Sequence, residues 1–144
     1  MKKIKLIIVL SLMCITGIYA QQNFSGYWMR ITDTSQFNID VTQIGDSIKG
    51  GICAVIHNGD FIDCYMNEIT DEDILDGMSP YSIKGTVSGN IAIVDFFSSY
   101  AWGWGKATIT KISDTQIKWE ITVEPSEGTC FIPSESVLTN QTEE

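Results

Sequence analysis

The chain has 144 residues, of which 44% are hydrophobic and 19% are charged, and its formal net charge is −9. This length predicts one globular domain with its own core. Nine basic residues stand against eighteen acids, which argues against nucleic acid or an anionic membrane surface as partner, because both are bound by clustered Lys and Arg. A basic protein or a neutral small molecule suits this balance better, or the charge only keeps the domain soluble.

Residues 1–20 have the three parts of a secretory signal peptide. Three lysines form the charged region, an apolar run continues to about Ile18, and Ala20 supplies the small residue at the cut. The apolar run is shorter than the about 20 residues of a membrane-spanning helix, so we expect cleavage and not an uncleaved anchor. The mature chain, 21–144, then keeps six basic residues against eighteen acids, a net charge of −12. We expect it to be secreted or periplasmic, without a membrane span.

After the signal, runs of alternating apolar residues are separated by turn residues, a pattern typical of antiparallel strands. With a two-residue turn at Gly45-Asp46, Ile39 faces Ile52, so the apolar sides of two runs meet. The predicted strands lie near 24–31, 37–44, 47–57, 60–66, 81–88, 91–99, 105–112 and 116–123.

The same register arithmetic works at two later turns. A turn at Gly89-Asn90 aligns Gly85 with Val94, and a three-residue loop at 113–115 brings Ile109 opposite Trp119. Hydrophobic face and turn position agree in each hairpin, so the registers are predicted by two features at once.

Three cysteines remain after cleavage, and two of them flank a predicted turn. Asn58-Gly59 is a strong hairpin signal because both turn positions require positive φ. Folding about this turn places Cys53 directly opposite Cys64, at a separation that a disulfide tolerates. We predict this disulfide, which an oxidising compartment favours. Cys130 is left as a buried thiol, a link between copies, or a free nucleophile.

The long connection 67–80 carries the one helix signal, with Thr70 as a cap and Gly77 as a stop. It also holds five acids between Glu68 and Asp76. Calcium takes several oxygen ligands, but Leu75 stands where an EF-hand loop needs one. Acids near the start of a short solvated helical turn explain the cluster more simply.

The segment 98–105 is rich in aromatic residues. Tyr100, Trp102 and Trp104 alternate with Ala and Gly, so in an extended segment they project to one side with accessible ring faces. Such a row suits stacking on a flat ligand or anchoring a protein partner. The alternative is that the row folds inward and fills one end of the domain, because large aromatics are mostly buried.

Consecutive hairpins with short turns predict an all-β fold, an antiparallel up-and-down meander of about eight strands that closes into a barrel. A two-sheet β-sandwich is the alternative. Residues 135–139 are expected to form a short extra strand against the barrel. The expected large inward side chains are Phe37, Ile39, Val41, Ile52, Ile83, Val94, Phe96, Ile109, Trp119 and Ile121.

Phe24-Ser-Gly26-Tyr-Trp28 opens the first strand with Gly-x-Trp, which resembles the N-terminal motif of the calycins, the lipocalin, avidin and fatty-acid-binding barrels. The resemblance implies that Trp28 packs across the closed end of a barrel. The family places an Arg on a late strand against this Trp, whereas the eighth predicted strand offers only Lys118. The second lipocalin motif, Thr-Asp-Tyr or Thr-Asp-Trp at a hairpin, is absent.

No constellation for catalysis or metal binding stands out. His57, the single histidine, is expected to face Asp60 across a turn as a solvated pair, and Cys53 and Cys64 serve better as a bridge than as zinc ligands. A His57–Cys130 pair is the one enzymatic alternative. We therefore expect a protein without cofactor and without enzymatic activity of its own.

Two functions stay open. One is an exported barrel that binds a small apolar or flat ligand inside or at its mouth. The other is an exported inhibitor or immunity-type protein that binds a basic protein through its acidic surface and aromatic loop. The interior discriminates between them, because a ligand-binding barrel needs a cavity of roughly 300 Å³ or more.

Overall fold

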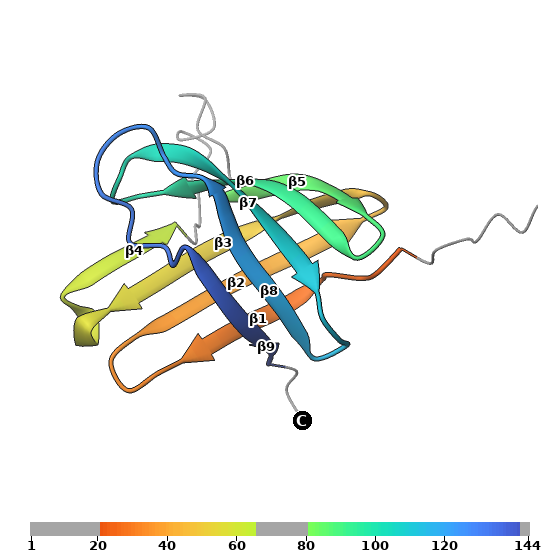
Figure 1. The fold of residues 1–144 in the computed structure, drawn as a ribbon, viewed down its shortest axis with the longest axis horizontal. Coiled ribbons are helices and arrows are strands. Elements are labelled where there is room, and N and C mark those ends of the chain that lie inside the picture. The colour runs from red at the N-terminus through yellow and green to blue at the C-terminus, as the bar shows by residue number, and fades with distance from the viewer. Residues whose placement is uncertain (1–20, 66–80, 142–144) are drawn as a thin grey trace, which may run out of the picture.

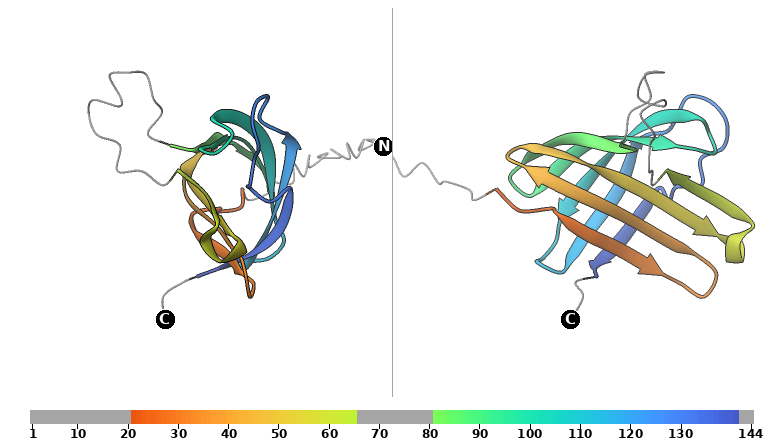
Figure 2. Two further views of the ribbon diagram at one scale, coloured as in Figure 1. Left: turned by 90° about the vertical axis from the view of Figure 1, so that its left-hand side faces the viewer. Right: turned by 180° about the vertical axis from the view of Figure 1, so that it is seen from behind.

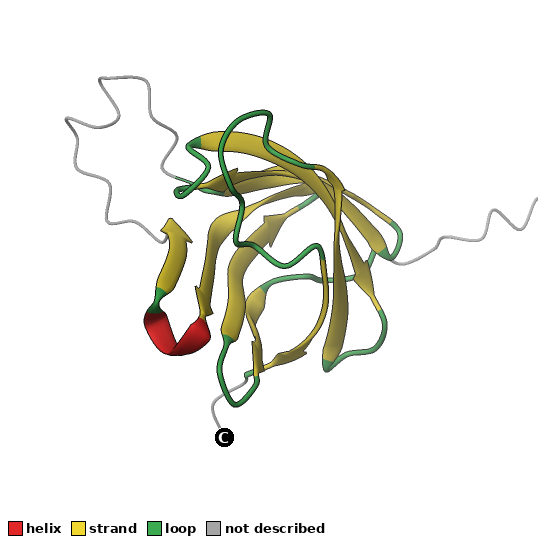
Figure 3. Cartoon of the chain, turned by 60° about the vertical axis from the view of Figure 1, so that its left-hand side comes forward, coloured by secondary structure: helices red, strands yellow, loops and turns green. Residues whose placement is uncertain are grey.

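The computed structural model describes residues 21–65 and 81–141, and nearly all of its regular structure is β-strand (Figures 1 and 3). The expected signal peptide and the helix and acidic cluster expected within 67–80 lie outside the described residues. The strands are β1 (Gly26–Ile31), β2 (Gln36–Ile44), β3 (Ser47–Ile56), β4 (Phe61–Tyr65), β5 (Ile83–Ser88), β6 (Ile91–Ser98), β7 (Gly103–Lys111), β8 (Gln116–Val123) and β9 (Glu135–Asn140), and the 3₁₀ turn η1 (His57–Gly59) joins β3 to β4.

Eight of these strands close into an antiparallel barrel, which confirms the predicted fold class and excludes the sandwich. The ring runs β1-β2-β3-β5-β6-β7-β8-β9 and returns to β1 through the β1–β9 pairing. The left view of Figure 2 looks into this ring from one end. Closure pairs the strand edges that an open sheet leaves exposed.

The membership of the ring differs from the prediction at two strands. β4, predicted as a strand of the barrel, pairs only with the second half of β3, from Ile52 to Ile56. β5 takes the first half of β3, from Ser47 to Gly50, and so continues the ring. β9, expected as an extra strand, is the one that closes the barrel between β8 and β1. The pairing that closes the barrel joins strands far apart in the sequence, so no turn residues between them could predict it.

Ser82 joins the ends of β4 and β5 where they meet along β3. Its buried hydroxyl donates to the Tyr65 carbonyl at 2.6 Å and accepts the Ile52 N–H at 2.9 Å. The Ser82 carbonyl accepts the Phe97 N–H at 2.8 Å. β4 therefore extends the barrel wall beyond the start of β5.

The predicted hairpin registers are confirmed. Ile39 pairs with Ile52, Gly85 with Val94, and Ile109 with Trp119. The β7–β8 ladder also contains a register shift between Lys106 and Ala107 that the sequence pattern did not predict.

The turn between β3 and β4 has the expected positive φ at Asn58 (57°) and Gly59 (101°), and also at His57 (53°). The ring of His57 packs edge-on against Phe61, with centroids 5.9 Å apart. Beyond the turn, Cys53 and Cys64 form the predicted disulfide. A disulfide persists in oxidising surroundings such as the cell exterior.

The barrel interior is filled with side chains. Nine of the ten expected inward residues are buried, and Ile121 is half-buried against them. Gly105 makes room for the Phe96 ring, because a Cβ at this glycine would lie 2.6 Å from it. Within the described residues, we find no helix of the length and apolarity needed to cross a membrane.

Candidate binding site at the open end of the barrel

The two ends of the barrel differ, and one of them is closed. At this closed end, where β1 begins, Phe24 and Trp28 are fully buried and the Trp28 indole N–H donates to the Phe24 carbonyl at 2.9 Å. The Lys111 ammonium lies 4.8 Å from the centroid of the Trp28 ring and donates to the Asn23 carbonyl at 2.7 Å. Burial lowers the pKa of Lys111, and the charge of Asp114 opposes this shift.

The cation over Trp28 therefore comes from β7. Lys118, the cation that the eighth strand offered, points away to an ion-pair cluster with Glu120 at 3.0 Å and Glu135 at 3.4 Å. The Glu120 hydrogen bond is the main reason that the pKa of Lys118 is raised.

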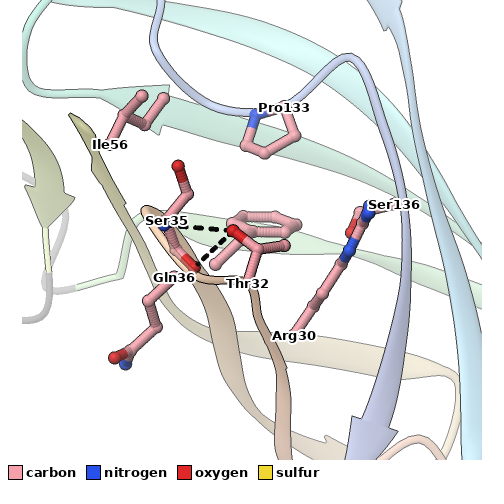
Figure 4. A pocket seen from close by; sticks show the side chains of 8 residues that line it. Arg30, Thr32, Ser35, Gln36, Ile56, Pro133 and Ser136 are labelled. Carbon is pink, nitrogen blue, oxygen red and sulfur yellow. Dashed lines mark hydrogen bonds between the residues drawn. The ribbon is translucent and has the colours of Figure 1, made fainter. Parts of the chain in front are cut away.

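The opposite, open end holds a pocket of about 310 Å³, which we call the mouth pocket (Figure 4). Its apolar wall is made by Phe37, Ile56 and Pro133. Its polar lining is made by Arg30, Thr32, Ser35, Gln36 and Ser136.

The strand pattern explains why Arg30 reaches this pocket. Side chains alternate across a strand, and in β1 the inward series that contains buried Trp28 continues with Arg30, which pairs with inward Phe37. The β1–β9 ladder contains only the pairs Trp28–Asn140 and Met29–Thr139. Beyond Met29 the two strands are no longer paired, and the mouth pocket lies at this seam.

The apolar wall of the mouth pocket is held from behind by Trp119. Its indole N–H donates to the Pro133 carbonyl at 2.9 Å, and its ring meets Phe37 edge-on with centroids 5.7 Å apart. Because Trp119 is fully buried, this part of the pocket is preformed.

Several polar groups of the lining bond to one another. The Thr32 hydroxyl donates to the Ser35 carbonyl at 3.2 Å and accepts the Ser35 N–H at 3.1 Å, and Gln36 donates to the Asn38 side chain at 3.3 Å. Ser136 is different, because its hydroxyl is buried and has no hydrogen-bond partner among the described residues.

Asp63 organises the loops of the open end. This buried carboxylate accepts four hydrogen bonds, from the Ser98 hydroxyl at 2.6 Å, the Ser99 hydroxyl at 3.2 Å, the Tyr100 N–H at 3.2 Å and the Phe131 N–H at 3.1 Å. It thus ties the β6–β7 turn and the segment 124–134 to β4. Hydrogen bonds to a carboxylate are stronger than those between neutral groups, so Asp63 holds these segments together. We call it the Asp63 junction.

The aromatic residues predicted as one row fall into two groups. Their segment is a tight turn from 99 to 102, not an extended stretch, and Trp102 has a φ of 54°. Tyr100 meets Phe61 and Phe131, with centroids 6.2 and 4.5 Å away.

Trp102 and Trp104 both pack against Phe97 on the outside of the barrel, at 5.6 and 5.4 Å. We call Phe97, Trp102 and Trp104 the outer aromatic patch. Trp102 is 66% exposed and Trp104 is 40% exposed, so neither fills the barrel interior. The Lys84 ammonium lies 4.4 Å from the centroid of the Trp104 ring.

Cys130 is a half-buried thiol near the Asp63 junction. Burial raises the pKa of this thiol, and hydrogen bonds with Ile132 and Ser98 only partly oppose the shift. A raised pKa suppresses the thiolate, which is the reactive form of cysteine. The surroundings of Cys130 therefore do not activate it as a nucleophile.

The sequence interpretation missed Arg30, Asp63 and Ser136. Arg30 could have been noticed, because it is the single arginine of the chain and stands two residues after Trp28, on the inward side of the same strand. Asp63 and Ser136 carry no local signal, since their surroundings come from distant segments.

We compared the chain with protein-family models, with curated proteins and with solved structures, and none of them matches it.

Proposed function

We propose that the chain is an exported, non-enzymatic binding protein of calycin-like architecture that holds a small, mainly apolar molecule at the open end of its barrel. The mouth pocket carries this proposal, because it combines a preformed apolar wall with a few convergent polar groups. That combination is typical of small-molecule sites.

The barrel interior is filled with side chains, which favours ligand binding in the mouth pocket over binding deep inside the barrel. Trp28, Trp119 and Phe96 fill the interior, whereas the mouth pocket has about 310 Å³, near the lower bound of ligand sites. A ligand of this kind is expected to be small and to keep part of its surface in water.

The calycin-like assignment is supported by the closed end. Gly26 opens β1, Trp28 is fully buried, and the Lys111 ammonium lies over the indole ring. A lysine from β7 thus occupies the place that the family gives to a late-strand arginine. The proposal that the chain is exported is supported by the Cys53–Cys64 disulfide.

Native mass spectrometry of the mature chain recovered from its own producer tests the function. We expect a bound small molecule on the wild-type chain and its loss in Ile56→Trp, which fills the mouth pocket. Ile62→Trp is the matched control, because Ile62 is 57% exposed on the neighbouring strand. A wild-type chain without adduct, or an adduct that persists in Ile56→Trp, would contradict binding at the mouth.

The outer aromatic patch favours a second candidate, an inhibitor or immunity-type protein that binds a basic protein. Exposed Trp residues are frequent interface hot spots, and Trp102 and Trp104 both present ring surface to solvent. Trp102→Ala and Trp104→Ala should shift the melting temperature by only a few degrees, because exposed side chains contribute little to folding. Native spectra in which a co-purified protein is lost from these variants, but not from Ile56→Trp, would favour this candidate.

A further inference from the structure

The outer wall of the barrel carries a row of charged side chains next to the outer aromatic patch. Lys84 pairs in register with Asp95, and Asp95 pairs with Lys106, across β5, β6 and β7. Two residues along from this row, Phe97 pairs with Trp104. Side chains two residues apart on a strand point to the same side, so the charged row and the aromatic rings share the outer face.

Beside Trp104 the outer face forms a pocket of about 250 Å³, which we call the outer pocket. It is lined by Lys84, Asp95, Trp104, Gly105, Lys106 and Val123. None of these described lining residues belongs to the mouth pocket. The outer pocket is therefore a separate candidate site, with one aromatic wall and three charged groups.

The polar groups of the outer pocket have hydrogen-bonding capacity of both kinds left over. Asp95 accepts from the Lys106 ammonium through Oδ1 at 2.7 Å, whereas its Oδ2 accepts no hydrogen bond from a residue within 21–65 and 81–141. The Lys84 ammonium, 4.4 Å from the centroid of the Trp104 ring, has neither an ion pair nor a hydrogen bond in the same part of the chain. An acceptor and a donor are thus available on neighbouring strands next to an indole ring.

Folding does not account for Trp102. Its side chain is 66% exposed, so it adds little to the core. Its φ of 54° lies in the left-handed region, which costs free energy for a bulky residue and suits Gly better. An exposed ring held on a strained backbone points to a role in recognition.

The charges beside the patch restrict its ligand. A basic protein would meet Lys84 and Lys106, and an anionic ligand would meet Asp95. A neutral ligand that both donates and accepts hydrogen bonds suits this row better. Sugar hydroxyl groups do both, and the C–H face of a pyranose ring is apolar and packs well on an indole.

We propose that the outer aromatic patch and the outer pocket together bind a neutral glycan. Trp102 and Trp104 stack on its pyranose rings, and Asp95 Oδ2 and Lys84 Nζ form hydrogen bonds with its hydroxyl groups. This site goes beyond the proposed function, because it is independent of the mouth pocket.

Affinity electrophoresis of the mature chain in native gels that contain a neutral β-glucan, mannan or galactan tests the proposal. Gels without polysaccharide give the reference mobility of each variant. We expect at least one of the three to retard the wild type. Trp102→Gly should weaken this binding at least about tenfold, as the loss of an aromatic hot spot does, and Asp95→Asn severalfold. Trp102→Phe should keep part of the binding, because it keeps a ring.

Tyr100→Ala is the matched control, because Tyr100 lies in the same turn but packs against Phe61 and Phe131, and it should leave the retardation unchanged. Trp102→Gly should not lower the melting temperature by more than a few degrees, because Gly relaxes the left-handed backbone. A larger fall would make Trp102 a structural residue and overturn its role in binding.

Failure of all three polysaccharides to retard the wild type, or retardation that survives Trp102→Gly combined with Trp104→Ala, would overturn the glycan proposal and leave the mouth pocket untouched. Retardation that is lost only in Ile56→Trp would also overturn it, because the glycan would then bind at the mouth. A second copy or another protein bound through Trp102, found by light scattering or in native spectra without glycan retardation, would assign the patch to a protein partner instead.

Discussion

Each end of the barrel has one cation on the inward side of a strand, Lys111 at the closed end and Arg30 at the open end. The two cations differ in whether the chain itself supplies their partners. At the closed end, Lys111 lies over the Trp28 ring and donates to the Asn23 carbonyl at 2.7 Å. At the open end, Arg30 lines the same pocket as the buried Ser136 hydroxyl, which has no hydrogen-bond partner within residues 21–65 and 81–141. The closed end gives its cation partners within the chain, whereas the Arg30 guanidinium and the Ser136 hydroxyl at the open end have no hydrogen-bond partner among the described residues.

This difference separates residues that hold the fold from residues that are free to bind. A satisfied buried group contributes to stability, whereas an unsatisfied one costs free energy until a ligand or water meets it. The open end is nevertheless well ordered, because Asp63 bonds two of its loops to β4. A preformed site of this kind limits the ordering cost of binding.

The largest expected effect is at the closed end. Trp28→Ala removes a fully buried side chain of the core, and we expect it to lower the free energy of unfolding by about 3 to 5 kcal/mol. The melting temperature should then fall by more than about ten degrees. Trp104→Ala, on the outer surface, is the control and should change it by only a few degrees. Equal losses in thermal melts of the two variants would contradict the closed-end assignment.

Asp63→Ala should cost about 3 kcal/mol or more, because four donors lose their acceptor at the open end. Denaturant unfolding measures the loss. Asp95→Ala is the matched control, since Asp95 forms an exposed ion pair with Lys106 and such pairs contribute at most about 1 kcal/mol. If Asp63→Ala lost no more than this control, the junction would not be needed to order the open end.

Removing the disulfide by Cys53→Ala with Cys64→Ala should cost about 3 kcal/mol, the chain-entropy value for the short loop that it closes. Denaturant unfolding of the oxidised wild type and of the double variant gives the difference. Peptide mapping without reductant must first find the two cysteines joined. Free thiols, or a bond of either one to Cys130, would refute the pairing.

The two inward cations should respond differently to neutralisation. Lys111→Gln loses a cation–π contact and a hydrogen bond, so we expect a loss of about 1 kcal/mol. Arg30→Gln loses no ion pair or side-chain hydrogen bond within the described chain and should leave the melting temperature within about two degrees. Thermal melts at neutral pH compare them, and a larger loss for Arg30→Gln would show that Arg30 is structural.

The smallest effect concerns Cys130. Since burial raises the pKa of its thiol in the folded chain, the folded state keeps this proton to higher pH than the unfolded state. The resulting stability is present below the unfolded pKa of about 8.5 and is lost as pH rises through the folded pKa. Cys130→Ala should therefore lose less stability than the wild type above that pH. Rapid alkylation of the native thiol at neutral pH would contradict the raised pKa.

Local features of the sequence determined the hairpins and their registers. The side-chain period of a strand is two residues, so a turn position and an apolar alternation together leave one register, as at Ile39–Ile52 and Cys53–Cys64. The Asn58-Gly59 turn was predictable in the same way. The burial of Trp28 was instead implied by the resemblance of Gly26-Tyr-Trp28 to the calycin motif.

The tertiary structure alone decided which strands close the ring and what meets at its ends. β9 replaced β4 in the barrel because closure depends on distant edges that must pair. Lys111 reached Trp28, and Arg30 reached Ser136, across more than eighty residues of sequence. Registers are local consequences of turn geometry, whereas these contacts exist only after the barrel has closed, because closure is what brings the first and last strands together.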